Sequence, residues 1–176
     1  MQKQCTVSLF KGLTSTQLNH AMTFARITRA ARGDYIFLTG ESADYLFLIQ
    51  SGLVKIAYIT ADGNEQVIDF RDDGSIFGEL FIGRYRHRIG VAQALTHCTI
   101  YKLSEQCLFD LIHWYPAINQ NFIEHLVNSH RESLARLHAI SRSDARLRLL
   151  GLLITLARQF HPLRGTIFYL HRGITQ

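Results

Sequence analysis

The stretch ARGDYIFLTGESADYLFLIQSGLVKI, residues 31–56, decides the fold, because short β-branched and aromatic runs alternate in it with glycine-containing turns. The same pattern continues to residue 103, with further runs LVKIAYIT at 53–60, VIDF at 67–70, VAQAL at 91–95 and TIYKL at 99–103. Asp62-Gly63 separates two of these runs and is typical of a hairpin turn. Many short strands with regularly spaced turns predict a sandwich or a barrel-like roll rather than a sheet built from βαβ units.

Helical patterns flank this region on both sides. The segment Thr14 to Gln17 has the form of a capping box and predicts a helix from about Ser15 to Phe24. Ser104 is a suitable cap for a helix through Trp114, and Pro116 is a suitable first residue for a long helix that follows.

One face of the predicted long helix has a heptad-like seam. Its a and d positions are apolar at both ends and polar in the middle: Ile123, Leu126, His130, Ser133, Leu137 and Ile140. A seam of this kind predicts a weak coiled-coil dimer.

Composition limits the class of protein. The 176 residues suit one domain, or one domain with part of a second. The cysteines Cys5, Cys98 and Cys107 are far apart, which argues against a disulfide framework, a four-thiolate zinc site and an iron–sulfur cluster. The longest apolar run, 149–157, is too short to span a membrane, and the first residues lack a signal-peptide pattern, so we expect a soluble cytoplasmic protein.

The positive charge is concentrated in the last third of the chain. Residues 1–116 have no net charge, whereas residues 117–176 carry eight arginines against three acidic residues. This excess indicates either a solvated arginine-rich helix face or a surface that lies close to a polyanion such as DNA.

The quoted stretch, together with DGNEQVIDFRDDGSIFGEL at 62–80, resembles the effector domain of the bacterial CRP/FNR transcription regulators. The resemblance implies an α+β fold: a jelly-roll-like β-roll flanked by helices, followed by a long dimerisation helix. It implies an effector domain over residues 1–115, the dimerisation helix over 116–143, and the start of a truncated winged helix-turn-helix domain over 144–176. We expect this chain alone not to read a DNA sequence, because the helix-turn-helix would begin beyond Gln176.

The same resemblance implies a cyclic-nucleotide site, with cyclic AMP as the first candidate effector. Gly78, Glu79 and Leu80 match the family's phosphate-binding turn, in which glycine allows close approach and the glutamate accepts a ribose hydroxyl. Arg88 would pair with the cyclic phosphate. Ile89 and Gly90 depart from the pattern, since the family has a hydroxyl residue and an alanine there, and the missing hydroxyl predicts weaker binding. The alternative is that Glu79 caps a turn and that Arg84, Arg86 and Arg88 form a solvated basic loop.

Ser133 matches the position at which the family reads the nucleotide base from the long helix. The alternative is a polar seam residue that fixes the register of the dimer. His130, one turn earlier, is either a pH-sensitive group in the seam or a neutral histidine bonded to a neighbour.

The sequence contains no pattern that predicts catalysis. H-E-x-x-H, G-x-S-x-G and a Walker loop are all missing, and His87 is not part of the metal-binding pattern of a cupin-type enzyme. We therefore expect a non-enzymatic homodimer that binds DNA only as the full-length regulator, with RNA polymerase as a further partner. Two alternatives stay open: a sensor of haem and a gas or of a metabolite in the same family, and a stand-alone cyclic-nucleotide-binding adaptor.

Overall fold

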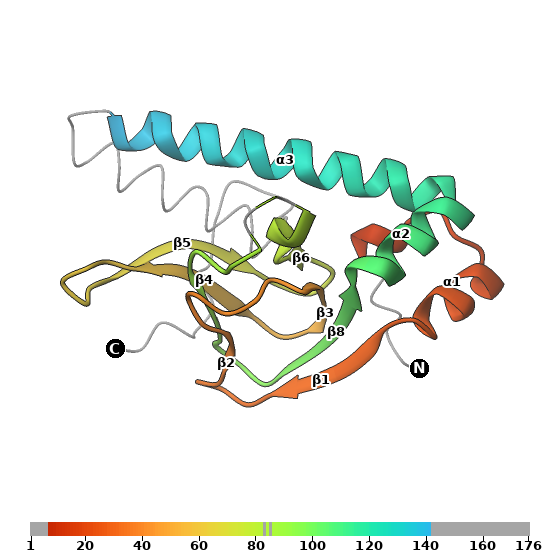
Figure 1. Ribbon diagram of the computed structural model, residues 1–176, viewed down its shortest axis with the longest axis horizontal. Coiled ribbons are helices and arrows are strands. Elements are labelled where there is room, and N and C mark those ends of the chain that lie inside the picture. Colours follow the sequence, from red (N-terminus) through yellow and green to blue (C-terminus); the bar gives the residue numbers. More distant parts are fainter. Residues whose placement is uncertain (1–6, 83, 85, 142–176) are drawn as a thin grey trace, which may run out of the picture. The chain divides into compact units, whose positions relative to one another are not determined.

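The computed structural model describes residues 7–82, 84 and 86–141 (Figure 1). The chain divides into two compact units, Met1–His125 and Leu126–Gln176. The first unit contains every strand of the described residues: β1 (Arg26–Ala30), β2 (Tyr35–Phe37), β3 (Tyr45–Ser51), β4 (Val54–Ile59), β5 (Glu65–Arg71), β6 (Ile76–Phe77), β7 (Val91–Ala94) and β8 (Cys98–Ser104). It also contains two short 3-10 helices, η1 (Ser8–Phe10) and η2 (Glu79–Ile82).

The strands form two antiparallel four-stranded sheets. The first has the order β1-β8-β3-β6 and the second the order β2-β7-β4-β5. The predicted turn at Asp62-Gly63 joins β4 to β5, with hydrogen bonds from Thr60 N to Asn64 O and from Gly63 N to Thr60 O, both of 2.9 Å. The predicted roll with flanking helices is therefore confirmed.

The helices begin where the sequence predicts them. Helix α1 spans Ser15–Met22, and its capping box with Thr14 and Gln17 is present. Helix α2 spans Glu105–Trp114, and the Ser104 hydroxyl accepts a hydrogen bond from Cys107 N at its start. Helix α3 spans Pro116–Ser141. Helices α1 and α2 lie together at the end of the roll where β8 leads into α2 (Figure 1).

Two apolar clusters hold the first unit together. One joins a face of the first sheet to the helices and includes Leu46, Leu103, Leu111, Ile118 and Phe122. The other fills the space between the sheets and includes Phe37, Phe47, Val54, Phe77 and Ile100. Side chains at alternate positions of β3 divide between the two clusters, as the period of a β-strand requires.

The first turns of α3 pack on the roll, whereas the helix surface from Leu126 onward is largely exposed.

The predicted domain limits at residues 115 and 143 stay predictions, and the predicted start of a DNA-binding domain at 144–176 lies outside the described residues. No helix of the described part is long and apolar enough to cross a membrane.

Candidate ligand-binding site

The predicted phosphate-binding turn lies at the end of β6, where Gly78 separates that strand from η2. Gly78 has a φ of +85°, and a Cβ added to it would lie 2.8 Å from the Phe47 ring and 2.9 Å from Arg88 Nη1. Both the left-handed backbone and the close packing therefore require glycine at this position. Glu79 begins η2 directly after it.

Arg88 is brought to the same place from the loop before β7, and it is 3% exposed. Its Nη1 donates to the Gly78 carbonyl at 2.8 Å and its Nη2 to the Tyr45 carbonyl at 2.7 Å. The guanidinium carbon lies 4.5 Å from the centre of the Phe37 ring and 5.2 Å from that of Phe47. Arg88 is thus a buried cation held by two carbonyls and two aromatic rings, and not part of a solvated basic loop.

One donor of Arg88 is left over. Its Nε atom is buried and has no hydrogen-bond partner among the described atoms. Burial lowers the pKa of Arg88, and the negative charges of Glu79, Asp44 and Glu41 partly offset this effect. A guanidinium stays charged even so, and this side chain is the one buried charged residue in the described part of the chain.

Glu79 faces His125 of α3, a residue that the sequence analysis did not assign to the site. Glu79 Oε2 lies 3.8 Å from His125 Nε2, which is an ion-pair distance rather than a hydrogen-bond distance. Burial raises the pKa of Glu79, but its interaction with His125, a backbone hydrogen bond and the charge of Arg71 together outweigh this effect, so the pKa lies below its ordinary value. The helical period provided a signal, because Ile118, Phe122 and His125 share one face of α3.

The other predicted site residues have different surroundings. Leu80 and Ile89 are exposed, at 41% and 56%. Gly90 is buried, and a Cβ added there would lie 2.5 Å from the carbonyl oxygen of Ala57. The backbone of this chain therefore requires glycine where the family pattern has alanine.

Ser133 belongs to the unit Leu126–Gln176, whereas the other predicted site residues belong to the unit Met1–His125. Its hydroxyl donates to the Ser129 carbonyl one turn earlier at 2.9 Å and accepts from Arg136 Nη2 at 3.3 Å. The structure thus brings together Gly78, Glu79 and Arg88, and the role of Ser133 stays a prediction.

The described residues contain no group of three or more His, Cys, Asp and Glu side chains that is able to hold a metal ion. Two of the described histidines have polar neighbours in the structure. His125 faces Glu79, and His87 Nδ1 lies 3.1 Å from the Gly40 carbonyl. Haem as an effector stays a prediction.

Comparison with known proteins agrees with this geometry. The family model described as cyclic nucleotide-binding domain matches residues 27–115. The chain is 26% identical over 151 residues to the cyclic AMP receptor protein of Thermus thermophilus, covering 86% of this chain and 70% of that protein. It is 28% identical over 145 residues to the CRP-like cAMP-activated global transcriptional regulator of Mycobacterium tuberculosis, covering 82% of this chain and 65% of that protein.

A third relative is the fumarate and nitrate reduction regulatory protein of Escherichia coli, at 27% identity over 129 residues, covering 73% of this chain and 51% of that protein. The chain thus spans between half and about two thirds of the length of several of these regulators. The crystal structure of the Thermus thermophilus catabolite activator protein superposes with a TM-score of 0.69 at 26% identity, over 88% of this chain and 72% of that one. The chain therefore belongs to the cyclic nucleotide-binding domain family and corresponds to the sensor part of a CRP/FNR-type regulator.

Proposed function

We propose that this chain binds a cyclic nucleotide at the turn formed by Gly78, Glu79 and Arg88, and that binding is its signal. The observation that carries the proposal is the buried Arg88 guanidinium, which lies 2.8 Å from the Gly78 carbonyl and keeps its Nε donor without a partner. A buried donor of this kind favours an anionic acceptor such as a cyclic phosphate. Relatives named for cyclic AMP make that nucleotide the first ligand to test.

Glu79 supplies the second polar contact of the proposed site. A carboxylate accepts hydrogen bonds from a ribose hydroxyl, and this one is held ionised through its interactions with His125 and Arg71. A ribose hydroxyl would have to share Glu79 with His125. Binding would therefore act on α3 as well as on the turn, since His125 belongs to that helix.

The affinity of this site is expected to be modest. Two donors of Arg88 already bind the carbonyl oxygens of Gly78 and Tyr45. A phosphate could accept hydrogen bonds from these donors only if the bonds to the carbonyls broke, which lowers the net affinity. Ile89 offers no hydroxyl to the ligand, which removes a hydrogen bond worth about 0.5–1.5 kcal/mol.

In the whole regulator, we propose that α3 forms a homodimer and that ligand binding changes the geometry of the two helices. The described exposed apolar residues of α3 support this: Ile123, Leu126, Val127, Leu134 and Leu137. DNA is then read by a further domain, and the two readers must match successive major grooves, about 34–36 Å apart. No chemical reaction is needed for such a signal.

The test is calorimetry with cyclic AMP and cyclic GMP on the chain and on single variants. Ile89→Ser should raise the affinity by up to about tenfold, because it restores a hydroxyl at an exposed position. Arg88→Lys should lower the affinity by about tenfold or more, because an ammonium lacks the guanidinium fork. Arg86→Ala is the matched control, since that arginine is exposed and pairs with Glu105 at 2.8 Å.

A second candidate function is the sensing of a non-nucleotide effector by the same fold. The two occupied donors of Arg88 and the exposed apolar Ile89 favour it. If millimolar cyclic AMP and cyclic GMP give neither heat nor a thermal shift, this reading replaces the first. A thermal-shift screen that includes 2-oxoglutarate and haem then identifies the class of effector.

A further inference from the structure

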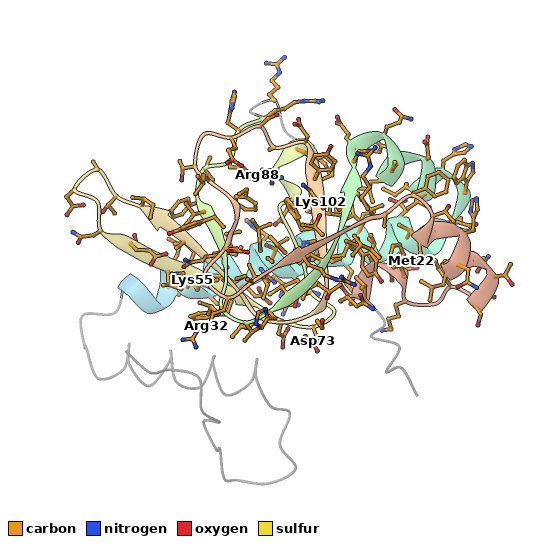
Figure 2. All side chains as sticks on the ribbon, turned by 90° about the horizontal axis from the view of Figure 1, so that it is seen from below. Met22, Arg32, Lys55, Asp73, Arg88 and Lys102 are labelled. Carbon is orange, nitrogen blue, oxygen red and sulfur yellow. The ribbon has the colours of Figure 1, made fainter. Side chains whose placement is uncertain are left out.

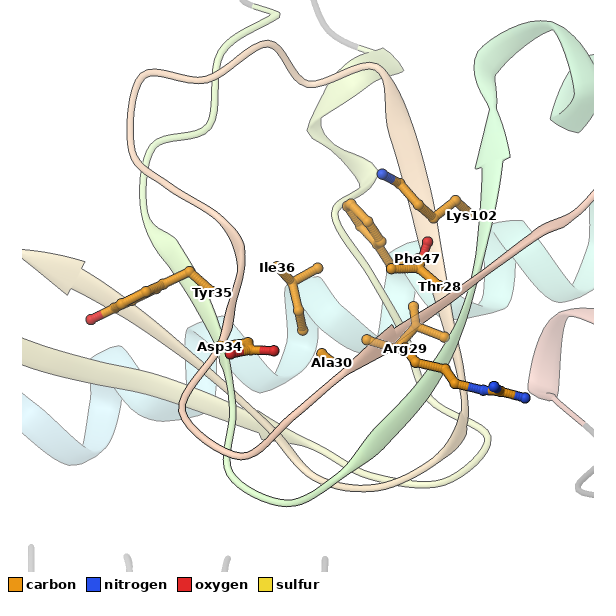
Figure 3. A pocket seen from close by; sticks show the side chains of 9 residues that line it. Thr28, Arg29, Ala30, Asp34, Tyr35, Ile36, Phe47 and Lys102 are labelled. Atoms are coloured by element: carbon orange, nitrogen blue, oxygen red, sulfur yellow. The ribbon is translucent and has the colours of Figure 1, made fainter.

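A small cavity opens between the two sheets at the edge formed by β1 and β2 (Figure 3). Strand β1 is an edge strand of the first sheet and β2 is an edge strand of the second. Among the described strands, no further strand pairs with either of them on the outer side to cover the gap. The cavity measures about 100 Å³. Its lining comes from β1, β2, β3, β8 and the turn before β2: Thr28, Arg29, Ala30, Asp34, Tyr35, Ile36, Phe47, Ile100 and Lys102.

The floor of the cavity is apolar. Phe47, Ile100 and Ala30 are buried members of the cluster that fills the space between the sheets, and Ile36 packs against that cluster. An occupant must therefore present an apolar body to this floor.

Lys102 breaks the alternation of β8. Cys98 and Ile100, at the preceding alternate positions, are buried between the sheets, so the period of two predicts an apolar side chain at 102 as well. The sheet register places Lys102 directly across from Phe47. A lysine on an apolar inner face departs from the local pattern, and such departures are expected at functional sites.

The Lys102 ammonium is directed over aromatic rings. Its Nζ lies 4.6 Å from the centre of the Tyr45 ring and 5.6 Å from that of Phe47. Within the described residues no carboxylate pairs with it, whereas Lys55 pairs with Glu65 at 2.7 Å. Figure 2 shows Lys102 in the same region as Arg88, and both cations contact the Phe47 ring.

The charges around the cavity favour a single negative charge on the occupant. Lys102 places one positive charge on the inner face of the first sheet, whereas Arg29, which precedes the inward-facing Ala30 on β1, carries its guanidinium on the opposite side of the strand (Figure 3). Asp34 lies on the opposite wall, where its Oδ2 accepts a hydrogen bond of 2.7 Å from Ala31 N (Figure 3). A monoanion pairs with the single charge of Lys102, whereas the second charge of a dianion would find no further cation in the cavity and would be repelled by Asp34.

We propose that this cavity is a second ligand site, which binds a short-chain monocarboxylate of about two or three carbons with its carboxylate at Lys102. The size supports this class, because the cavity is smaller than the roughly 150 Å³ that accommodate benzene and well below the pockets of about 300 Å³ or more that hold larger ligands. A nucleotide does not fit there. The site shares the Phe47 ring with the one formed by Gly78, Glu79 and Arg88 but none of its polar side chains, so either proposal can fail without the other.

The test is an NMR titration of the whole 176-residue chain with acetate and propionate. Saturable shifts are expected at the amides of Thr28, Ile36 and Lys102, with dissociation constants in the millimolar range, because ligands of this size have few atoms to contribute. Propionamide and propylammonium have nearly the same shape without the negative charge, and they should give no saturable shift. This comparison uses the unmodified protein and does not depend on how a variant folds.

Substitution of Lys102 then tests whether its ammonium group binds the carboxylate of the ligand. Lys102→Met keeps the apolar stem and should weaken propionate binding by about tenfold or more, while Lys102→Arg should stay within about threefold of the original. Arg32→Gln is the control, since that exposed arginine precedes β2 without lining the cavity. Equal binding of propionate and propionamide, unchanged propionate binding in Lys102→Met, or no saturable shift with any carboxylate would each overturn the proposal.

Discussion

At the scale of single residues, Arg88 holds the carbonyls of Gly78 and Tyr45 together inside the roll. We predict that Arg88→Met lowers the free energy of unfolding by about 3 kcal/mol, because it leaves two carbonyl oxygens in a buried site without their charged donor. Urea unfolding followed by tryptophan fluorescence measures this change.

The control for this prediction is Arg86→Ala on the same loop. Arg86 is exposed and its ion pair with Glu105 lies at the surface, so its removal should cost less than about 1 kcal/mol. Similar unfolding midpoints for the Arg88 and Arg86 variants would show that the buried contacts of Arg88 do not stabilise the fold.

Glu79 leads to a prediction about pH. Its pKa is lowered in the folded protein from the ordinary value of 4.5, so folding favours the ionised carboxylate. The stability that Glu79 contributes is then fully present above about pH 4.5 and is lost as the pH falls through the lowered folded-state value. Urea unfolding between pH 3 and pH 7 should show a shallower acid-side loss of stability for Glu79→Gln than for the original chain. Parallel profiles would contradict the assigned interaction with His125 and Arg71.

At the scale of elements, the exposed face of α3 is the feature with the clearest consequence. Leu126 and Leu137 are 37% and 63% exposed, and both lie on the seam that the heptad pattern predicts. We predict that Leu126→Glu combined with Leu137→Glu converts a dimer into monomers, because four buried carboxylates would meet in the seam. Light scattering of both proteins measures this. Glu124→Gln, which changes charge on an exposed position outside that seam, should leave the dimer intact.

The elements themselves were largely predictable from local signals. The capping box at Thr14, the cap at Ser104 and the turn at Asp62-Gly63 each depend on a few neighbouring residues, and each is present in the structure. Strand β1 and the two-residue strand β6 had no comparable signal. The residues of β1 are mostly exposed, and β6 is too short for any periodicity to appear.

The site was predictable only in part. The glycine pattern and Glu79 followed from the resemblance to a family, but the partners of each side chain depend on contacts between distant segments. Arg88 reaches the carbonyl of Tyr45, 43 positions earlier, and Glu79 meets His125 across the fold. Lys102 appeared in the sequence only as one residue of a strand, and the sheet register had to be known before its place on the inner face became evident.

At the scale of the whole molecule, the roll and the proposed dimer contribute to stability in different ways. Both apolar clusters of the first unit are formed within one chain, so the roll needs no partner to bury its core. The exposed apolar face of α3, in contrast, would be buried in the proposed dimer. In such a dimer, the free energy of unfolding would therefore depend on the protein concentration.

We predict that the thermal midpoint of the chain rises with protein concentration, since a dimer is favoured over unfolded monomers as concentration increases. A hundredfold rise in concentration adds about 2.7 kcal/mol to the stability of the associated state, which corresponds to a shift of several degrees. The variant with glutamate at positions 126 and 137 should keep a cooperative transition, because its roll retains both clusters, but its midpoint should not depend on concentration. A concentration-independent midpoint for the original chain would contradict dimerisation of the folded chain. Loss of the cooperative transition in the variant would instead show that the roll cannot fold without its partner.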